Sequence, residues 1–340
     1  MTCPAEPCDL AEPCEARTQN LILLCSSVVG LLGGIFIVVT HFLLPSHQQS
    51  TAGRVTLFWM SVSDILLSGT YLVETLLLWS PLAMCPSEGV SIDRRACIVI
   101  GAVNEYASLC CIIWTTALSY NLHVAMTSAS GRVSSRSYWA RMHATAWGLP
   151  ALIVALLSWK GAFGSAGNSC WISDDFQWAR FVFYYCPVAA SLGVTVFTHC
   201  RMKRQVAALR SLYCTSLLES GRCGAEGGAD ARNQHAAPVY SAASVSAFAS
   251  SVMSAGRGAS LRGAVSSVDD DITHRLCKLL VVFGSIIAVQ LINRIHDVAS
   301  HGVPNFWLGS AENAVSPLQG FADAIALCTY AYSPSRLTSS

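Results

Sequence analysis

Seven apolar stretches, each long enough to cross a lipid bilayer, divide this 340-residue chain into hydrophobic and polar segments. The hydrocarbon core of a bilayer is about 30 Å thick, and about 20 helical residues cross it with every backbone amide bonded inside the helix. We therefore predict an all-α membrane protein, a seven-transmembrane helix bundle in the region 21–332. The predicted spans are residues 21–44, 55–80, 97–126, 138–159, 176–200, 274–300 and 306–332.

The composition agrees with a chain that lies in lipid. Only 12% of the residues are charged and 53% are hydrophobic, so the chain has too few charges to cover a water-exposed surface. Membrane lipid is accordingly an expected partner. The formal net charge of +1 argues against a nucleic-acid partner, because neutralising phosphates requires a concentrated basic face.

The basic residues predict which side of the membrane each connection occupies. Placing residues 1–20 outside the cell puts most of the 21 lysines and arginines in cytoplasmic connections. The segment 1–20 is acidic and contains no apolar core, so we expect an extracellular amino terminus rather than a cleavable signal peptide. Residues 202–273 are predicted to be a long disordered third cytoplasmic loop, and residues 333–340 a short cytoplasmic tail. The expected location is the plasma membrane, with several passes.

Two cysteines lie where a disulfide would close the outer face. Cys97 begins the third predicted span and Cys170 lies in the connection between the fourth and fifth, and both would face an oxidising compartment. We predict a bridge between them. The other outer cysteines are Cys3, Cys8, Cys14 and Cys85, whose three alternative pairings the sequence leaves open. Their spacing does not match a structural zinc site.

Two carboxylates are predicted at the same depth inside the membrane. Asp64 and Asp323 each lie nine residues from the cytoplasmic end of their spans, roughly 13 Å deep at 1.5 Å per residue. Together they can share a proton or hold a sodium ion, the one cofactor that the sequence suggests. The alternative is that each carboxylate separately meets a helix contact or an internal water. The neighbours expected to add oxygen atoms are Ser61, Ser63, Asn121 and Gln319.

A second group of polar residues is predicted nearer the outer face. Ionisable residues within spans are costly in lipid, so each is a candidate site. They are expected to line a polar cavity between the second, third and sixth spans, where they bind a ligand or form a structural salt bridge of Arg294 with Glu105 or Glu74. The group consists of Glu74, Asn104, Glu105, Gln290, Asn293, Arg294, His296 and Asp297.

The sequence contains no motif that favours catalysis. It has no His-Glu-x-x-His metal site, no phosphate-binding Gly-Lys loop and no nucleophile elbow, so we do not expect an enzyme. A retinal-binding pump would need a Schiff-base lysine in its last span. The lysines are Lys160, Lys203 and Lys278, all at loops or span edges.

Short motifs along most of the bundle resemble those of one receptor family. The chain resembles the slime-mould cyclic-AMP receptors and their animal and protist orphan relatives, among the G-protein-coupled receptors. The matching residues are Ser61, Ser63, Asp64, Trp114-Thr115, Ala146-Trp147-Gly148-Leu149-Pro150, Cys170-Trp171-Ile172 and Gln319-Gly320-Phe321. The chain differs from rhodopsin-like receptors, because it lacks Asp-Arg-Tyr after the third span and Asn-Pro-x-x-Tyr in the seventh. It also has Asp323 where relatives usually place asparagine.

The resemblance implies an extracellular small-molecule ligand and a heterotrimeric G protein inside. Trp171 joins the candidate ligand residues, and the candidate G-protein contacts are Arg132, Arg136, Arg201, Lys203, Arg204, Arg275 and Lys278. The positive-inside rule alone is the alternative explanation for each of these basic residues. A proton- or ion-coupled seven-span transporter is the other function considered, since Asp64 and Asp323 can carry protons. The missing internal repeats and the predicted outer disulfide count against transport.

Overall fold

The computed structural model places most of the chain in long helices. It describes residues 12–43, 52–78, 93–127, 135–166, 169–219, 288–289, 292–293, 296, 306–322 and 324–325. The long single helices are α1 (Glu12–Leu43), α3 (Ala52–Leu78), α4 (Arg94–Thr127) and α8 (Cys186–Glu219). The shorter elements are α5 (Arg136–His143), η3 (Ala144–Gly148), α6 (Leu149–Trp159), β1 (Phe163–Ala166), β2 (Ser169–Ile172), η4 (Asp174–Phe176), α7 (Gln177–Arg180), η5 (Phe181–Tyr185), α11 (Phe306–Val315) and η7 (Ser316–Leu318).

Five of the predicted spans are confirmed as helices long and apolar enough to cross a membrane. They are Arg17–Leu43, Gly53–Leu78, Arg94–Asn121, Arg136–Trp159 and Asp174–Arg204. Large apolar side chains such as Leu32, Phe42, Leu152 and Phe197 are exposed on their surfaces, as hydrocarbon surroundings require. The fold is therefore an all-α membrane bundle. The seventh predicted span appears in part as α11 and η7, whereas most of 274–300 lies outside the described residues.

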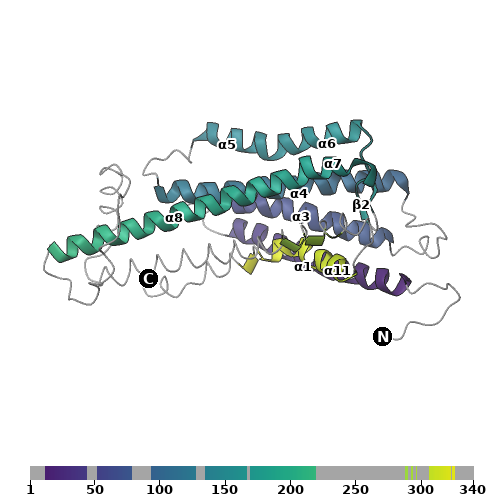
Figure 1. The fold of residues 1–340 in the computed structure, drawn as a ribbon, viewed down its shortest axis with the longest axis horizontal. Helices are drawn as coiled ribbons and strands as arrows, with labels where there is room; N and C mark the ends of the chain where they lie inside the picture. The colour runs from purple at the N-terminus through teal and green to yellow at the C-terminus, as the bar shows by residue number, and fades with distance from the viewer. Residues whose placement is uncertain are drawn as a thin grey trace.

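The helices pack side by side, both between neighbours in the chain and between segments far apart in sequence. The contacts run from α1 to α3, from α3 to α4 and from α4 to α8, while α6 packs on α4 and α11 packs on α1. Figure 1 shows these helices running lengthwise, with the β1–β2 hairpin and the start of α1 at one end and α8 extending beyond the others at the opposite end. The central helix is α4, because it contacts α3, α6, α8 and both strands.

Two prolines mark local changes of helix geometry, as their positions predict. Proline has no amide hydrogen and its ring clashes with the carbonyl four residues earlier, so the preceding turn must open. The fourth residue before Pro150 is Ala146, within the π-helical turn η3, and the fourth before Pro187 is Phe183, within the π-helical turn η5. Both prolines thus end a widened turn inside an otherwise continuous span.

The first span and the seventh segment meet backbone to backbone. A Cβ atom on Gly30 would lie 1.8 Å from the carbonyl oxygen of Pro317, and one on Gly33 would lie 2.5 Å from the Cα atom of Phe321. From the other side, a Cβ atom on Gly320 would lie 2.7 Å from the carbonyl oxygen of Gly30. The absence of side chains at these glycines permits the close approach. Because lipid tails are themselves apolar, helices in a membrane associate mainly through van der Waals packing of this kind.

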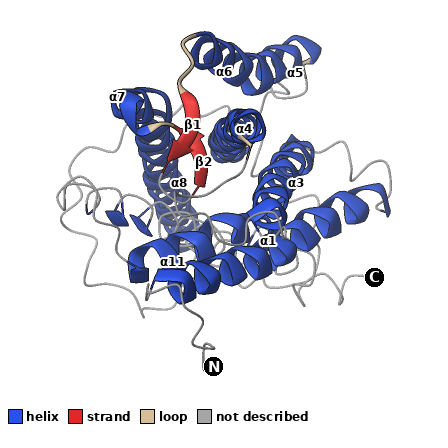
Figure 2. Ribbon diagram, turned by 90° about the vertical axis from the view of Figure 1, so that its right-hand side faces the viewer, coloured by secondary structure: helices blue, strands red, loops and turns tan. Residues whose placement is uncertain are grey.

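A small antiparallel hairpin covers one end of the bundle. Strand β1 pairs with β2 so that Phe163 lies opposite Ile172 and Ala166 opposite Ser169. Figure 2, the view onto this end, shows the hairpin among α4, α7 and α8. Its apolar side chains join Leu157 of α6 and Ala179 of α7 in one buried cluster. No strand was predicted in the connection between the fourth and fifth spans, so the structure adds this hairpin.

The fifth span continues beyond its predicted end. Helix α8 runs to Glu219, whereas the span was predicted to stop at residue 200 and a disordered loop to begin at 202. The prediction was wrong for residues 202–219, because this stretch is rich in helix-forming alanine, leucine, arginine and lysine and contains no glycine or proline. Gly221 is the first glycine after it. The remainder of the loop lies outside the described residues.

Candidate ligand site and polar groups of the bundle

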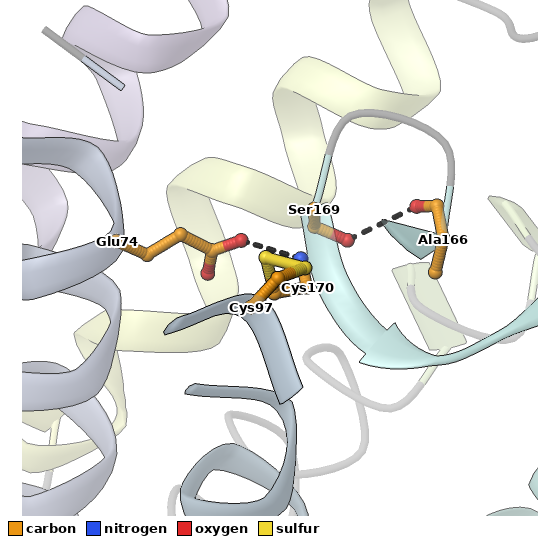
Figure 3. The surroundings of a disulfide bond; sticks show 5 residues. All are labelled: Glu74, Cys97, Ala166, Ser169 and Cys170. Atoms are coloured by element: carbon orange, nitrogen blue, oxygen red, sulfur yellow. Dashed lines mark hydrogen bonds between the residues drawn. A yellow bond between two sulfur atoms is a disulfide. The ribbon is translucent and has the colours of Figure 1, made fainter. Parts of the chain in front are cut away.

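The predicted disulfide is present and ties the hairpin to the start of α4. Cys97 and Cys170 are bonded, their Cα atoms are 5.1 Å apart, and 73 residues separate them in sequence. Figure 3 shows the bridge between the first turn of α4 and strand β2. Both cysteines are buried. The bridge fixes β2 over the end of the bundle at which α4 begins.

A carboxylate from α3 holds the same point of the strand. Oε1 of Glu74 accepts a hydrogen bond of 2.7 Å from the backbone amide of Cys170, and Glu74 is 1% exposed. In Figure 3 the second carboxylate oxygen points away from the strand. Glu74 thus connects α3 to a strand that the disulfide already joins to α4.

The next strand residue is held by α4 itself. The indole Nε1 of Trp171 donates a hydrogen bond of 2.6 Å to Oε2 of Glu105, which is completely buried. Gly101 lies one turn before Glu105, and a Cβ atom there would lie 3.1 Å from the Cα atom of Trp171. Because Gly101 has no side chain, the strand can lie directly on the helix. Cys97, Gly101 and Glu105 therefore form one face of α4 that contacts β2.

Arg180 was not among the predicted site residues, yet it contacts the other side of Trp171. Its Nε atom donates to the carbonyl oxygen of Ile172 at 2.9 Å, and its Nη2 atom donates to Oδ1 of Asp174 at 2.7 Å. The guanidinium lies over the Trp171 ring, 5.3 Å from the ring centroid. Ile172 and Asp174 lie only eight and six residues before Arg180 in sequence. Strand β2, which ends at Ile172, was not predicted. Arg180 is thus committed to the hairpin.

We call the Cys97–Cys170 bridge and the hydrogen bonds from β2 to Glu74 and Glu105 the clamp of β2. Three buried oxygen atoms beside it have no hydrogen-bond partner among the described residues. They are Oε2 of Glu74, Oε1 of Glu105 and Oδ1 of Asn104. Asn104 is 7% exposed and directly precedes Glu105 in α4. Buried polar atoms are nearly always paired in folded proteins. Arg294, which was predicted to pair with Glu105 or Glu74, lies outside the described residues, as do Gln290 and Asp297.

The polar group extends to the seventh segment. Nδ2 of Asn293 donates a hydrogen bond to Glu312 of α11. The ring of Tyr184 in η5 packs edge-on against Trp171, with 5.2 Å between the ring centroids. Asn293 was predicted as a site residue, whereas Glu312 and Tyr184 were not. An acidic residue inside an apolar span was the available signal for Glu312.

Asp64 lies in a buried contact between the second, third and seventh spans. Oδ1 of Asp64 accepts a hydrogen bond of 3.3 Å from the thiol of Cys111. The backbone of Gly320 also approaches it, since a Cβ atom there would lie 3.3 Å from Cβ of Asp64. Gln319, a predicted neighbour, directly precedes Gly320. Asp323, the predicted second carboxylate, lies outside the described residues.

Asn121 does not belong to the surroundings of Asp64, which corrects its predicted placement. It lies ten residues after Cys111 in α4, about 15 Å further along the helix. Nδ2 of Asn121 donates to the hydroxyl of Thr56 at 2.8 Å, and its Oδ1 accepts from the hydroxyl of Tyr138. Asn121 therefore joins α3, α4 and α5 at the opposite end of the bundle from the hairpin.

The two serines predicted beside Asp64 bond to their own helix. Oγ of Ser61 donates to the carbonyl oxygen of Leu57 at 2.9 Å, and Oγ of Ser63 donates to that of Trp59 at 3.2 Å. Both serines are buried. Such bonds to the preceding turn are the usual way for a hydroxyl to lie inside a membrane helix. Each oxygen keeps lone pairs that can still accept a hydrogen bond.

The basic residues predicted to contact a G protein are described only in part. Arg136 at the start of α5 is exposed, and so are three residues of α8: Arg201, Lys203 and Arg204. Arg136 is the first residue of α5, and the other three lie in α8 at the end of the apolar stretch Asp174–Arg204. Arg132, Arg275 and Lys278 lie outside the described residues.

The helical bundle, with five helices long and apolar enough to cross a membrane among the described residues, defines a multi-pass membrane protein. A family model described as slime mold cyclic AMP receptor matches residues 13–208, more than half of the chain. The chain belongs to this family. The matched region contains the clamp residues Cys97, Glu105 and Cys170 as well as Asn121.

Individual relatives come from animals and from a slime mould. G-protein coupled receptor 157 of Rattus norvegicus is 30% identical over 183 residues, which are 52% of this chain and 50% of the relative. Cyclic AMP receptor-like protein A of Dictyostelium discoideum is 25% identical over 192 residues, 56% of this chain and 46% of the relative. Cyclic AMP receptor 4 of the same organism is 25% identical over 178 residues, which are 52% of this chain and 38% of the relative. The matches thus span half or less of the relatives' length.

Proposed function

We propose that this protein is a G-protein-coupled receptor in the plasma membrane that transmits an extracellular small-molecule signal to a heterotrimeric G protein. Its amino terminus and the hairpin face outside. The observation that carries the proposal is the clamp of β2, in which a disulfide and two buried carboxylates join one outer strand to α3 and α4. Family membership supports signalling over transport, the alternative considered above.

Helix α4 gives a physical route from one side of the membrane to the other. It contains 34 residues, about 50 Å at 1.5 Å per residue. Its outer part holds Cys170 and Trp171, and its inner part holds Thr56 and Tyr138 through Asn121. A ligand that prefers one packing of the outer part shifts the population of the whole bundle. The two polar groups on α4 are the contacts that such a shift rearranges.

The inner ends of the helices offer a basic surface for the partner. Arg201, Lys203 and Arg204 lie in the last turn of the apolar stretch Asp174–Arg204, before α8 continues to Glu219, and Arg136 begins α5. All four are exposed. Positive patches of this kind steer an acidic protein surface into place and strengthen its binding electrostatically.

Resonance energy transfer between labelled Gα and Gβγ subunits in cells tests the proposal. Expression of the full chain is expected to raise ligand-free dissociation of at least one Gα class above that in empty-vector cells. The double variant Arg201→Glu with Lys203→Glu should abolish the increase. Arg95→Gln, at an exposed site near the start of α4, is the matched control and should leave it unchanged. Surface expression without activation of any Gα class would contradict the proposal.

A further inference from the structure

We propose that the receptor's outer site binds a small organic amine, held by the free carboxylate oxygens of Glu74 and Glu105 and by the carbonyl oxygen of Asn104. This inference rests on the proposed receptor function, because it names the ligand class of the same site. It differs from what the names of the slime-mould relatives suggest, since cyclic AMP is an anion.

The first argument is the unmatched set of acceptors. Glu74 and Glu105 each use one oxygen to hold consecutive residues of β2, so their carboxyl groups flank the same short stretch of strand. Their other oxygens, and Oδ1 of Asn104, are buried and unpaired among the described residues. A carbonyl and an ionised carboxylate only accept hydrogen bonds. An ammonium group fits this arrangement, because it donates hydrogen bonds and its positive charge favours the ionised form of both carboxyl groups.

The second argument is that Arg180, the arginine that contacts Trp171, already uses its guanidinium to hold the hairpin. An anionic phosphate would need a positive group beside it, and Arg180 is the described arginine that contacts Trp171. Its nitrogen atoms donate to Ile172 and Asp174, and its plane lies over the indole. Moving it to a ligand would break the hairpin contacts. A phosphate beside Glu74 and Glu105 would also meet like charge, which disfavours binding.

The third argument separates an organic cation from a metal ion. No group of three or more His, Cys, Asp or Glu side chains able to hold a metal occurs within the described part of the chain. Aromatic rings surround the clamp instead: Tyr184 packs edge-on against Trp171 at 5.2 Å, and Tyr185 packs against Tyr184 at 5.3 Å. Aromatic faces attract organic cations and accept the apolar part of such a ligand.

Matched ligand pairs test the inference on the purified full chain in lipid nanodiscs. Tyramine and tryptamine are compared with 4-hydroxyphenylacetate and indole-3-acetate, which keep the ring but replace the amine by a carboxylate. Cyclic AMP and calcium chloride complete the set. The amines are expected to raise the melting temperature with increasing concentration, since ligands that bind only the folded state stabilise it. The acids, cyclic AMP and calcium are expected to leave it unchanged.

Substitutions then locate the site. Glu105→Gln keeps an acceptor for Trp171 and Glu74→Gln keeps one for Cys170, but each replaces the free oxygen by a donor. Each should weaken amine affinity roughly tenfold to a hundredfold, the range for hydrogen bonds to charged groups. Asp175→Asn neutralises an exposed outer carboxylate and is the control, with unchanged affinity.

Three results would overturn the inference. They are stabilisation by the acids or cyclic AMP rather than the amines, stabilisation by calcium alone, and no stabilisation by any of these compounds. Unchanged amine affinity in the Glu74→Gln, Glu105→Gln double variant would also place the amine elsewhere. The wild-type comparison remains decisive if a variant does not fold. The binding assay contains no G protein, whereas the resonance energy transfer assay tests coupling to one. A negative result in the first therefore rejects the amine ligand, and a negative result in the second rejects the receptor function.

Discussion

The hydroxyl of Ser26 donates a hydrogen bond of 2.9 Å to the carbonyl oxygen of Asn313, 287 residues away in sequence. Asn313 lies four residues before Pro317, which has no amide hydrogen to offer that carbonyl. Ser26 of α1 therefore supplies the bond that the seventh segment cannot make for itself. The hydroxyl of Ser68 in α3 similarly donates to the carbonyl oxygen of Pro317 at 3.2 Å. Two neighbouring spans thus satisfy a backbone that proline interrupts.

Ser26→Ala is expected to lower the free energy of unfolding by about 1 kcal/mol, because it leaves a carbonyl unpaired in lipid. Thermal unfolding of the purified protein in micelles measures the change. Ser27→Ala is the matched control, since the Ser27 hydroxyl bonds to Leu23 within its own helix. An equal decrease in the free energy of unfolding in both variants would show that the bond from Ser26 to Asn313 does not stabilise the protein.

Gly30→Ala is expected to cost more, about 1–3 kcal/mol, because overpacking forces the backbone to move. The added Cβ would lie 1.8 Å from the backbone oxygen of Pro317, where no side-chain rotation can relieve the clash. The yield of folded protein in fluorescence size-exclusion chromatography provides the measurement. At Gly69 of α3 a Cβ would meet nothing within 4 Å, so Gly69→Ala should retain full yield. Full yield of Gly30→Ala would contradict the packing of α1 against the seventh segment.

Removing the outer disulfide should destabilise the receptor by about 2–4 kcal/mol, the usual range for a bridge that closes a long loop. The variant replaces Cys97 and Cys170 together by alanine, which avoids leaving a free thiol. Cell-surface expression and the melting temperature with and without dithiothreitol report the effect. Cys186→Ala, which removes an exposed free cysteine, should change neither quantity. Wild-type protein that is insensitive to reductant would oppose a structural role for the bridge.

Tyr138→Phe should raise ligand-free G-protein activation about two- to fivefold. The substitution removes the hydroxyl that donates to Asn121 and so releases α5 from α4. A lost hydrogen bond of roughly 0.5–1 kcal/mol changes a two-state population by about this factor. Tyr120→Phe removes an exposed hydroxyl one residue before Asn121 and should have no effect. Reduced basal activation in Tyr138→Phe would mean that this contact favours the active packing instead.

The sodium site of Asp64 and Asp323 stays a prediction. If the two carboxylates hold a sodium ion, sodium chloride should raise the melting temperature relative to the same concentration of N-methylglucamine chloride. Asp64→Asn should remove the difference, because a neutral amide binds sodium far less well than a carboxylate. A sodium effect that persists in this variant would place the ion elsewhere.

Hydropathy and local chemistry were enough to predict five of the spans and the bridge between Cys97 and Cys170. A membrane helix must satisfy its own backbone, so its position follows from the lengths of the apolar segments. Cys97 and Cys170 were predicted to pair because they fall at connections on the same side of the membrane. Pro150 and Pro187 were correctly placed at local breaks, since the effect of proline on the preceding turn is also local.

Tertiary partners were less accessible to sequence reasoning. Asn121 of α4 was predicted beside Asp64 of α3, but the position of α4 along α3 places Cys111 beside Asp64 and Asn121 beside Thr56. The hairpin escaped prediction because its strands are four residues each and are stabilised mainly by packing on α4 and α6. Arg180 gained its meaning only from that hairpin. The extension of α8 past residue 200 was missed because hydropathy predicts where lipid ends, not where a helix ends.

The glycine face of α1 has a consequence for biosynthesis. Ribosomes deliver α1 to the membrane first, whereas Pro317 and Phe321, which fill the surface around Gly30 and Gly33, emerge more than 280 residues later. Throughout translation this groove must therefore remain against lipid or be shielded by the insertion machinery. Closure of the first helix against the last is the step that completes the bundle, so a chain interrupted before Pro317 leaves its earliest segment unfinished.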